Sequence, residues 1–155
     1  MIQNRFTSTG FVINGSNEIL MIKHKKLGKW MPPGGHVDEN ELPCDAVLRE
    51  VYEETGVRAQ IIFTKKKKAT SSDVQLRELP LPMEILLTNF EGDGLYNCIN
   101  LNYLCCTDDT ALNPSTAEVS DIGWFSLSEA LKLDTYDFIR ASIQTAYKAY
   151  QNEDV

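Results

Sequence analysis

The sequence predicts a single α/β domain in which helices pack against a sheet of strands. Its 155 residues are enough for one hydrophobic core, and 43% of them are hydrophobic, as in an ordinary globular protein. Short segments with strand character alternate with stretches of helical periodicity, and no internal repeat or linker divides the chain. We therefore expect residues 1–155 to form one domain.

Five segments have the alternation or the composition of β-strands. They are residues 7–13, 18–24, 58–63, 83–88 and 97–106. Asn14-Gly15 between the first two is a strong turn signal and predicts a hairpin. The last segment alternates most clearly, with Asn100 and Asn102 on one face. These asparagines could pair with a nucleobase beside a cleft or lie on a solvated surface, and both interpretations stay open.

Residues 43–56 have the signature of an amphipathic helix. Pro43 stands where a first helical residue would, and Gly56 stands where a helix ends. At about 100° per residue, the less polar side chains fall on one stripe, which is the expected core face. The stripe consists of Cys44, Val47, Leu48, Val51 and Thr55.

The same helix carries three acidic residues close together. Glu50, Glu53 and Glu54 fall within an arc of about 100°, because spacings of three and four bring side chains to one face. Carboxylates packed this closely repel one another, and a hard divalent cation would cancel the repulsion. Since acidic residues on the polar side of a helix are usually just solvated, the spacing alone does not establish a metal site.

Two further helices are predicted near the C-terminus. Ser126 and Glu129 form a capping-box pattern that begins a short helix. Residues 135–150 then carry apolar side chains at helical spacing, which we interpret as packing on the sheet.

The residues around the acidic helix follow a longer pattern at fixed spacing. The pattern consists of Gly35, Glu41, Arg49, Glu50, Val51, Glu53, Glu54, Gly56 and Val57. It resembles the Nudix box, GX5EX7REUXEEXGU with U a bulky aliphatic residue, and every specified position matches. The resemblance implies a Nudix-type α/β/α sandwich with a mixed, mainly antiparallel central sheet. It also implies an enzyme that hydrolyses a phosphoanhydride bond by water attack at phosphorus.

The resemblance assigns a metal role to several residues. Glu50, Glu53 and Glu54 match the metal-binding glutamates, and the expected ion is Mg²⁺ or Mn²⁺. One of these residues, with Glu50 and Glu53 as the candidates, is expected to orient or deprotonate the water. The carbonyl of Gly34 or Gly35 matches a backbone ligand, and we assign the metal to Gly35.

Glu41 and Arg49 match a structural pair that braces the loop against the helix, and Gly34 is assigned a structural role beside them. Pro32-Pro33 restrict the backbone just before Gly34-Gly35 allow a tight turn, so we expect a sharp glycine corner here.

Three residues outside the box are weaker candidates. Glu118 matches a later glutamate of the family by its spacing to Trp124, and it would add a carboxylate to the metal site. Lys23 and His24 stand where family members present basic groups to substrate phosphates, although a solvated edge is an equal alternative. Trp30 could stack on a base, but core packing is the safer interpretation.

Composition excludes several classes of protein. A net charge of −7 argues against a nucleic acid polymer as partner, and the absence of an apolar run of about 18 residues or of a signal-peptide pattern argues against a membrane. We therefore expect a cytoplasmic protein. The four cysteines form no CxxC pair, so a zinc site is not expected and the thiols should be reduced.

The substrate is less well determined than the chemistry. We expect a small-molecule nucleotide, and the absence of subfamily marks beyond the box leaves a mild preference for nucleoside triphosphates or modified nucleotides. An ADP-sugar-type pyrophosphatase and a non-catalytic nucleotide-binding sensor on the same fold remain alternatives. Because many members of the family dimerise, the sequence leaves a homodimer open.

Overall fold

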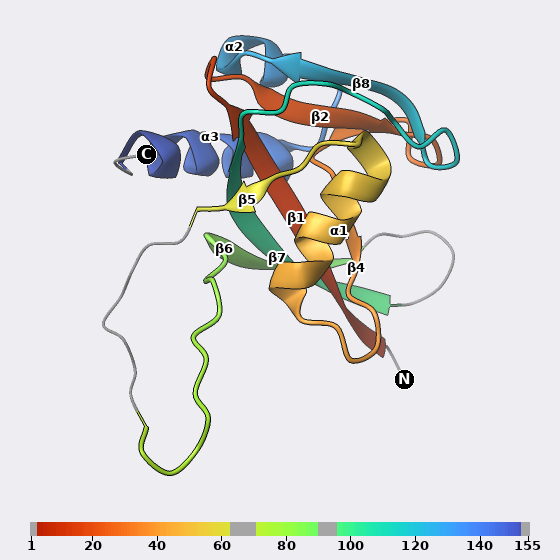
Figure 1. The fold of residues 1–155 in the computed structure, drawn as a ribbon. Coiled ribbons are helices and arrows are strands. Elements are labelled where there is room, and N and C mark those ends of the chain that lie inside the picture. Colours follow the sequence, from red (N-terminus) through yellow and green to blue (C-terminus); the bar gives the residue numbers. More distant parts are fainter. Residues whose placement is uncertain (1–2, 63–70, 90–95, 153–155) are drawn as a thin grey trace.

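The computed structural model describes residues 3–62, 71–89 and 96–152 (Figure 1). Within these ranges eight strands form one sheet. The strands are β1 Gln3–Asn14, β2 Ile19–His24, β3 Trp30–Met31, β4 Gly34–His36, β5 Gln60–Ile61, β6 Glu84–Asn89, β7 Tyr96–Thr107 and β8 Val119–Phe125. The helices are α1 Pro43–Thr55, α2 Leu127–Ala130 and α3 Asp137–Asn152.

Strand β1 is the centre of the sheet. It pairs in parallel with β7 along its whole length and antiparallel with β2 and β4. The remaining pairings, of β2 with β3 and β8 and of β7 with β5 and β6, are all antiparallel. The predicted mixed, mainly antiparallel sheet is therefore confirmed.

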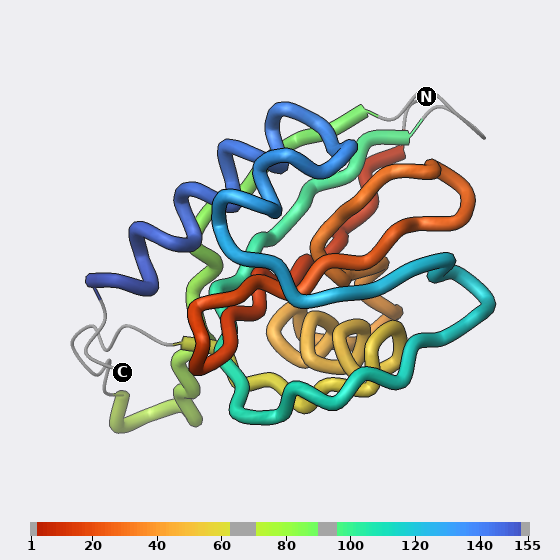
Figure 2. Tube along the Cα trace, turned by 90° about the horizontal axis from the view of Figure 1, so that it is seen from above, coloured from red at the N-terminus to blue at the C-terminus, as the bar shows by residue number. Residues whose placement is uncertain are grey.

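Helices cover both faces of the sheet, so the predicted sandwich is also confirmed. Figure 2 shows α1 and α3 on opposite sides of β1 and β7. Successive residues of a strand point to opposite faces, and β1 divides its side chains accordingly. Phe11 and Ile13 pack with α3, whereas Val12 packs with α1.

Helix α1 begins and ends where its sequence predicts. Pro43 occupies the first turn, and Gly56 ends the helix in the left-handed conformation at φ 75°. The predicted stripe faces the core: Cys44, Val47, Val51 and Thr55 are buried, and Leu48 packs against the same cluster.

The C-terminal helices differ only slightly from expectation. The capping box of Ser126 and Glu129 is present at the start of α2, with both reciprocal hydrogen bonds made. Helix α3 begins at Asp137, two residues later than predicted. Trp30 meets Phe125 edge to face, with ring centroids 5.1 Å apart, and packs against the core. This agrees with the interpretation of Trp30 as a core residue.

The expectation of a tight glycine turn at Gly34-Gly35 is wrong. Both residues lie in β4, opposite Thr9 and Ser8 of β1. Neither has a positive φ; the described glycines that do are Gly28 and Gly56. Glycine is required at residue 34 by close approach, since a Cβ there would lie 2.5 Å from the Ser8 carbonyl oxygen.

Three further expectations concern the cysteines, the run of lysines and a membrane-spanning helix. All four cysteines are free thiols, and three of them are buried. The Lys65–Lys68 run, which could be a solvated turn or a cationic rim, lies outside the described residues. Among the helices of the described ranges, none combines the length and apolarity needed to cross a membrane.

Candidate active site

Glu54 is a carboxylate on the buried side of α1. The Gly34 amide donates a hydrogen bond of 2.9 Å to Glu54 Oε2, and the residue is 3% exposed. Burial raises the pKa of Glu54 to about 8; the Gly34 hydrogen bond opposes this shift, and the nearby charges of Glu50 and Glu118 add to it. No salt bridge to Glu54 is made by the described residues, so ionisation of this buried carboxyl group is unfavourable until a cation compensates its charge.

Gly35 makes room for a second carboxylate. A Cβ at this position would lie 2.5 Å from both Cδ and Oε1 of Glu50. The Glu50 side chain therefore fills the space that the missing side chain leaves beside β4. Burial raises the pKa of Glu50, while the hydrogen bond from Arg49 lowers it.

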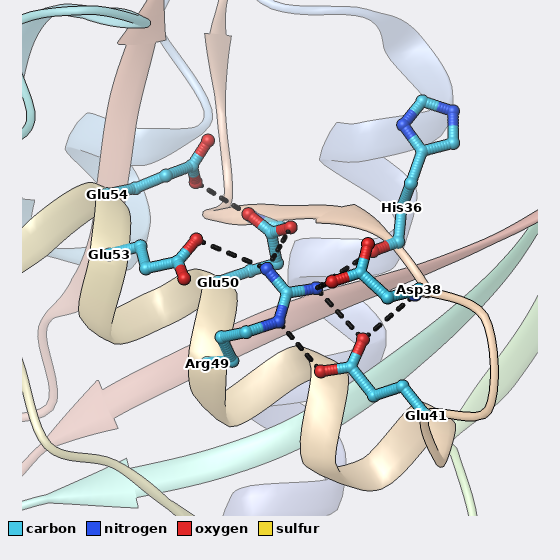
Figure 3. Close-up of polar contacts among 8 residues, drawn as sticks. His36, Asp38, Glu41, Arg49, Glu50, Glu53 and Glu54 are labelled. Carbon is cyan, nitrogen blue, oxygen red and sulfur yellow. Dashed lines mark hydrogen bonds and ion pairs between the residues drawn. The ribbon is translucent and has the colours of Figure 1, made fainter.

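Arg49 ties the loop before α1 to the helix, as the box resemblance implies. Its Nε and Nη2 donate to the two oxygens of Glu41, at 2.7 and 2.9 Å. Its Nη1 donates to Glu50 Oε1 at 2.8 Å and to Glu53 Oε2 at 3.2 Å, so one guanidinium forms hydrogen bonds with three carboxylates; the Asp38 carboxylate lies 3.6 Å from Nη2 (Figure 3). The hydrogen bonds from Arg49 lower the pKa of Glu41.

A cleft of about 540 Å³ runs past these groups. Six of its lining residues bear on the proposed chemistry: His24, Gly34, Gly35, Glu50, Glu54 and Glu118. Glu118 reaches the cleft because β2 and β8 pair, and the Lys25 amide donates to its carbonyl at 2.9 Å. The structure thus brings the loosely predicted Glu118 to the same cleft as two glutamates of the box.

Two residues predicted to bind the metal or the substrate, Glu53 and Lys23, lie outside this lining, as do the structural pair Glu41 and Arg49. The Glu53 side chain is 57% exposed and bonds to Arg49. Lys23 sits in β2 between its pairing partners Trp30 and Asp121. Glu53 and Lys23 both remain site predictions.

His24, in contrast, lines the cleft. Its Nδ1 accepts a hydrogen bond of 3.3 Å from the Leu27 amide. Burial lowers the pKa of His24, and the neighbouring Glu118 carboxylate opposes that shift.

The donor chemistry of the cleft fits a hard divalent cation. Carboxylates of Glu50, Glu54 and Glu118 and the backbone of Gly34 and Gly35 offer oxygen ligands. In their present positions no three acidic, histidine or cysteine side chains of the described ranges are close enough together to enclose an ion. A bound cation would therefore draw the carboxylates inward, which their mutual repulsion now opposes.

Of the two asparagines of β7, Asn100 is half-buried beside this cleft and Asn102 is buried. Thr7, which lines the cleft, donates from Oγ1 to Asn100 Oδ1. Asn102 is 5% exposed and donates to Glu84 Oε1 at 2.9 Å. Both asparagines line a small hollow of about 40 Å³ with Leu86 and Phe138, so the solvated interpretation is wrong for Asn102.

Sequence reasoning missed several lining residues. Thr7, Tyr96 and Tyr136 border the cleft from three distant segments. Tyr96 also lies under the guanidinium of Arg5, which is 4.6 Å from its ring centroid. No local spacing connects these positions, so only the β1–β7 pairing and the packing before α3 could reveal them.

The fold and the cleft together are those of a Nudix-type domain. The family model described as "NUDIX domain" matches residues 4–145. The chain therefore belongs to the NUDIX family.

Relatives and solved structures agree with this assignment. The chain is 27% identical over 143 residues to an RNA pyrophosphohydrolase of Rickettsia conorii (strain ATCC VR-613 / Malish 7), covering 91% of this chain and 86% of the relative. It is 43% identical over 58 residues to a Bacillus subtilis (strain 168) protein named "Putative 8-oxo-dGTP diphosphatase"; this covers 36% of this chain and only 39% of the relative. The fold superposes on a NUDIX-family hydrolase of Clostridium perfringens with a TM-score of 0.77, at 23% identity, covering 94% of this chain and 97% of the other.

Proposed function

We propose that this NUDIX enzyme hydrolyses a phosphoanhydride bond of a nucleotide with the help of Mg²⁺ or Mn²⁺. The observation that carries the proposal is the cleft in which the buried, uncompensated Glu54 lies with Glu50 and Glu118. A diphosphate is a polyanion that this acidic cleft would repel unless a cation were bound between them. Carboxylates and backbone carbonyls are the ligands that such an ion prefers.

Each site residue has a proposed role. Glu50, Glu54 and Glu118, with the Gly35 carbonyl, would hold the ion; Glu53 would join them only after leaving Arg49. When bound, the ion would neutralise the phosphate oxygens and make water more acidic. Glu50, with Glu53 as the alternative, would orient the water molecule and accept a proton from it. The water oxygen would attack phosphorus as the bridging P–O bond breaks, and the bridging oxygen would leave with the departing phosphate group. Glu41, Arg49 and Gly34 would hold the loop and helix in place.

Two neighbouring features would bind the rest of the substrate. His24 lines the cleft and, with Lys23, would contact substrate phosphates. The Asn100 and Asn102 amides would pair with the edge of a nucleobase in the hollow next to Thr7. Because that hollow is about 40 Å³, a base would enter only if side chains such as Phe138 rotated away. Such a subsite would accept the base of any nucleotide; nucleoside triphosphates or modified nucleotides remain the preferred candidates from the sequence.

RNA is the second candidate substrate. It is favoured by a relative that matches over most of both chains and is named an RNA pyrophosphohydrolase. The net charge of −7 argued against a nucleic acid polymer, so the two observations point in opposite directions. An RNA oligonucleotide with a 5′-triphosphate therefore belongs in the substrate panel.

One chain supplies every residue of the proposed site, so the chemistry does not require the homodimer that the sequence leaves open. Sedimentation velocity of the purified protein measures its oligomeric state directly. The cytoplasmic location remains a prediction from the sequence.

The test is a panel of nucleoside triphosphates, 8-oxo-dGTP, ADP-ribose and the triphosphate RNA, each with Mg²⁺, Mn²⁺ or EDTA. We expect turnover that needs the cation, and a loss of at least about 100-fold in Glu54→Gln. Tight nucleotide binding by calorimetry with no turnover would favour the sensor alternative. No turnover and no binding on the whole panel would overturn the proposal.

A further inference from the structure

Ser8 carries a buried hydroxyl that has no hydrogen-bond partner. The residue lies in the middle of β1 and is 0% exposed, and its Oγ meets no donor or acceptor within the described ranges. Leaving a buried hydroxyl unpaired costs free energy, so such a group calls for an explanation. The packing of β1 alone gives none, because an apolar residue of similar size would be buried there without the cost of an unpaired hydroxyl.

The pairing of β1 with β4 places this hydroxyl beside Glu50. Ser8 lies directly opposite Gly35, and the Cβ atoms of such antiparallel partners leave the sheet on one face about 4.5–5.5 Å apart. On that face, the Cβ position of Gly35 is 2.5 Å from the Glu50 carboxyl group. A Cβ on Gly10, two residues further along β1, would meet Val51 of α1, which confirms that this face is the α1 side. Ser8 therefore points toward the space that Glu50 occupies.

One carboxylate oxygen of Glu50 accepts no hydrogen bond from the described residues. Its Oε1 accepts from Arg49 Nη1 at 2.8 Å, and the described residues provide no donor to Oε2. Arg49 also donates hydrogen bonds to Glu41 and Glu53, and its contact with Glu50 reaches only one carboxylate oxygen. That single hydrogen bond does not fix the orientation of the Glu50 carboxylate. A second hydrogen-bond donor on the sheet side of Glu50 would fix the orientation of its carboxylate.

We propose that Ser8 is a positioning residue for Glu50: in the cation-loaded protein its Oγ donates a hydrogen bond to the Glu50 carboxylate, opposite Arg49. Arg49 and Ser8 then hold the carboxylate from two sides, and one of its oxygens stays directed at the ion or the water. The inference rests on the proposed function, since it gives Ser8 a partner only when Glu50 is drawn into the site.

The test compares Ser8→Ala with a matched control, Thr135→Val. Thr135 also has a buried hydroxyl without a partner among the described residues; it lies just before α3 and is not part of the cleft lining. Mn²⁺ affinity is measured by electron paramagnetic resonance, and melting temperature is measured in EDTA and in Mn²⁺. We expect Ser8→Ala to weaken Mn²⁺ binding about threefold to tenfold and to lower kcat about tenfold with KM nearly unchanged. In EDTA it should melt no lower than the wild type, whereas Thr135→Val should shift melting equally with and without Mn²⁺.

A double-mutant cycle shows whether Ser8 acts through Glu50. In a Glu50→Ala background, which has no side-chain acceptor for Ser8, Ser8→Ala should have no further effect on Mn²⁺ affinity. A persisting effect, or wild-type affinity and kcat in Ser8→Ala, would overturn the inference while leaving the proposed function intact. A wild type that neither binds Mn²⁺ nor turns over any nucleotide would overturn both. If Ser8→Ala does not fold, Ser8→Cys, which keeps the size but weakens the donor, is held to the same expectations.

Discussion

The space that Gly35 leaves empty is filled by the carboxyl group of Glu50. A Cβ on Gly35 would lie 2.5 Å from Glu50 Oε1 and 2.7 Å from Oε2. The contact couples the short strand β4 to the acidic side of α1. It explains in steric terms why the sequence pattern has glycine at this position, although the backbone there makes no turn.

Replacing Gly35 by alanine should displace Glu50 without unfolding the protein. The atoms that the new methyl group would meet belong to the flexible end of a side chain, and the φ of Gly35 is one that alanine can adopt. We expect a loss of turnover of at least about 100-fold, with a melting temperature close to that of the wild type.

Gly34→Ala is the contrasting variant for this prediction. Its methyl group would lie 2.5 Å from the Ser8 carbonyl oxygen and 2.7 Å from the Thr9 Cα, and neither backbone atom can move aside easily. We expect it to lose about 2 kcal/mol or more of unfolding free energy in urea titrations. Equal stability of the two alanine variants would contradict this account of the β1–β4 contact.

Arg49→Lys should show that the guanidinium, and not only its charge, organises the site. Lysine cannot reproduce the paired hydrogen bonds to Glu41 together with those to Glu50 and Glu53. We expect kcat to fall about tenfold to 100-fold and unfolding free energy to fall by about 1–2 kcal/mol, measured by steady-state kinetics and urea unfolding.

Arg140→Lys provides the control for Arg49. Arg140 donates to the carbonyls of Leu131 and Leu133, at 3.0 and 2.8 Å, outside the cleft. Its replacement should lower stability to a similar extent while kcat stays near the wild-type value. A similar loss of kcat in both variants would mean that reduced stability, rather than the orientation of Glu50, explains the effect of Arg49→Lys.

The part of the site that the sequence predicts is the part encoded locally. Glu50 and Glu54 share one helix, so their spacing places both near a common face, and the Glu41–Arg49 pair lies within the same pattern. Helical spacing cannot tell which member of a cluster meets the cleft, because burial depends on what packs there. Glu53 was for this reason predicted alongside its neighbours, although its side chain turns to Arg49 and solvent.

The parts that could not be predicted depend on contacts between distant segments. Strand β4 forms because β1 offers Gly34 and Gly35 a partner, whereas Pro-Pro-Gly-Gly by itself is typical of a turn. Tyr96 and Tyr136 reach the cleft through the β1–β7 pairing and the approach to α3. Strand alternation and helical stripes are local and made the α/β class predictable, whereas the sandwich was implied by the family resemblance. The order of the strands depends on pairings between distant segments and was not predicted.

Gly56→Ala should destabilise the end of α1. Gly56 has φ 75°, where a Cβ is strained, and that Cβ would lie 2.8 Å from the Asn113 Cβ. Gly28→Ala is the matched control, with φ 65° but no atom within 4 Å of the added Cβ. We expect a loss of about 1 kcal/mol for Gly28→Ala and about 2 kcal/mol or more for Gly56→Ala in urea unfolding. Equal losses of unfolding free energy in the two variants would show that Asn113 moves aside to make room for the added Cβ at residue 56.

Glu54→Gln should stabilise the cation-free protein at alkaline pH while abolishing activity. The carboxyl group has an ordinary pKa of 4.5, and burial raises it to about 8 in the folded protein. Between these values the folded state keeps a proton that the unfolded state has lost, so stability falls as pH rises from about 4.5 to about 8. The amide has no such proton to lose, and we expect the variant to be more stable than the wild type by about 1–3 kcal/mol at pH 8 in EDTA.

Urea unfolding at pH 5, 6.5 and 8, with EDTA or with Mn²⁺, measures this effect. The difference between variant and wild type should be smallest at pH 5, where both carry a neutral group at residue 54. Some pH dependence should remain in the variant, because burial also raises the pKa of Glu50. Mn²⁺ should reverse the order at pH 8, since a bound cation stabilises the folded wild type by mass action and the amide binds it poorly. Parallel pH profiles for the two proteins in EDTA would mean that Glu54 is ionised in the folded state, and that it needs no cation to compensate its charge.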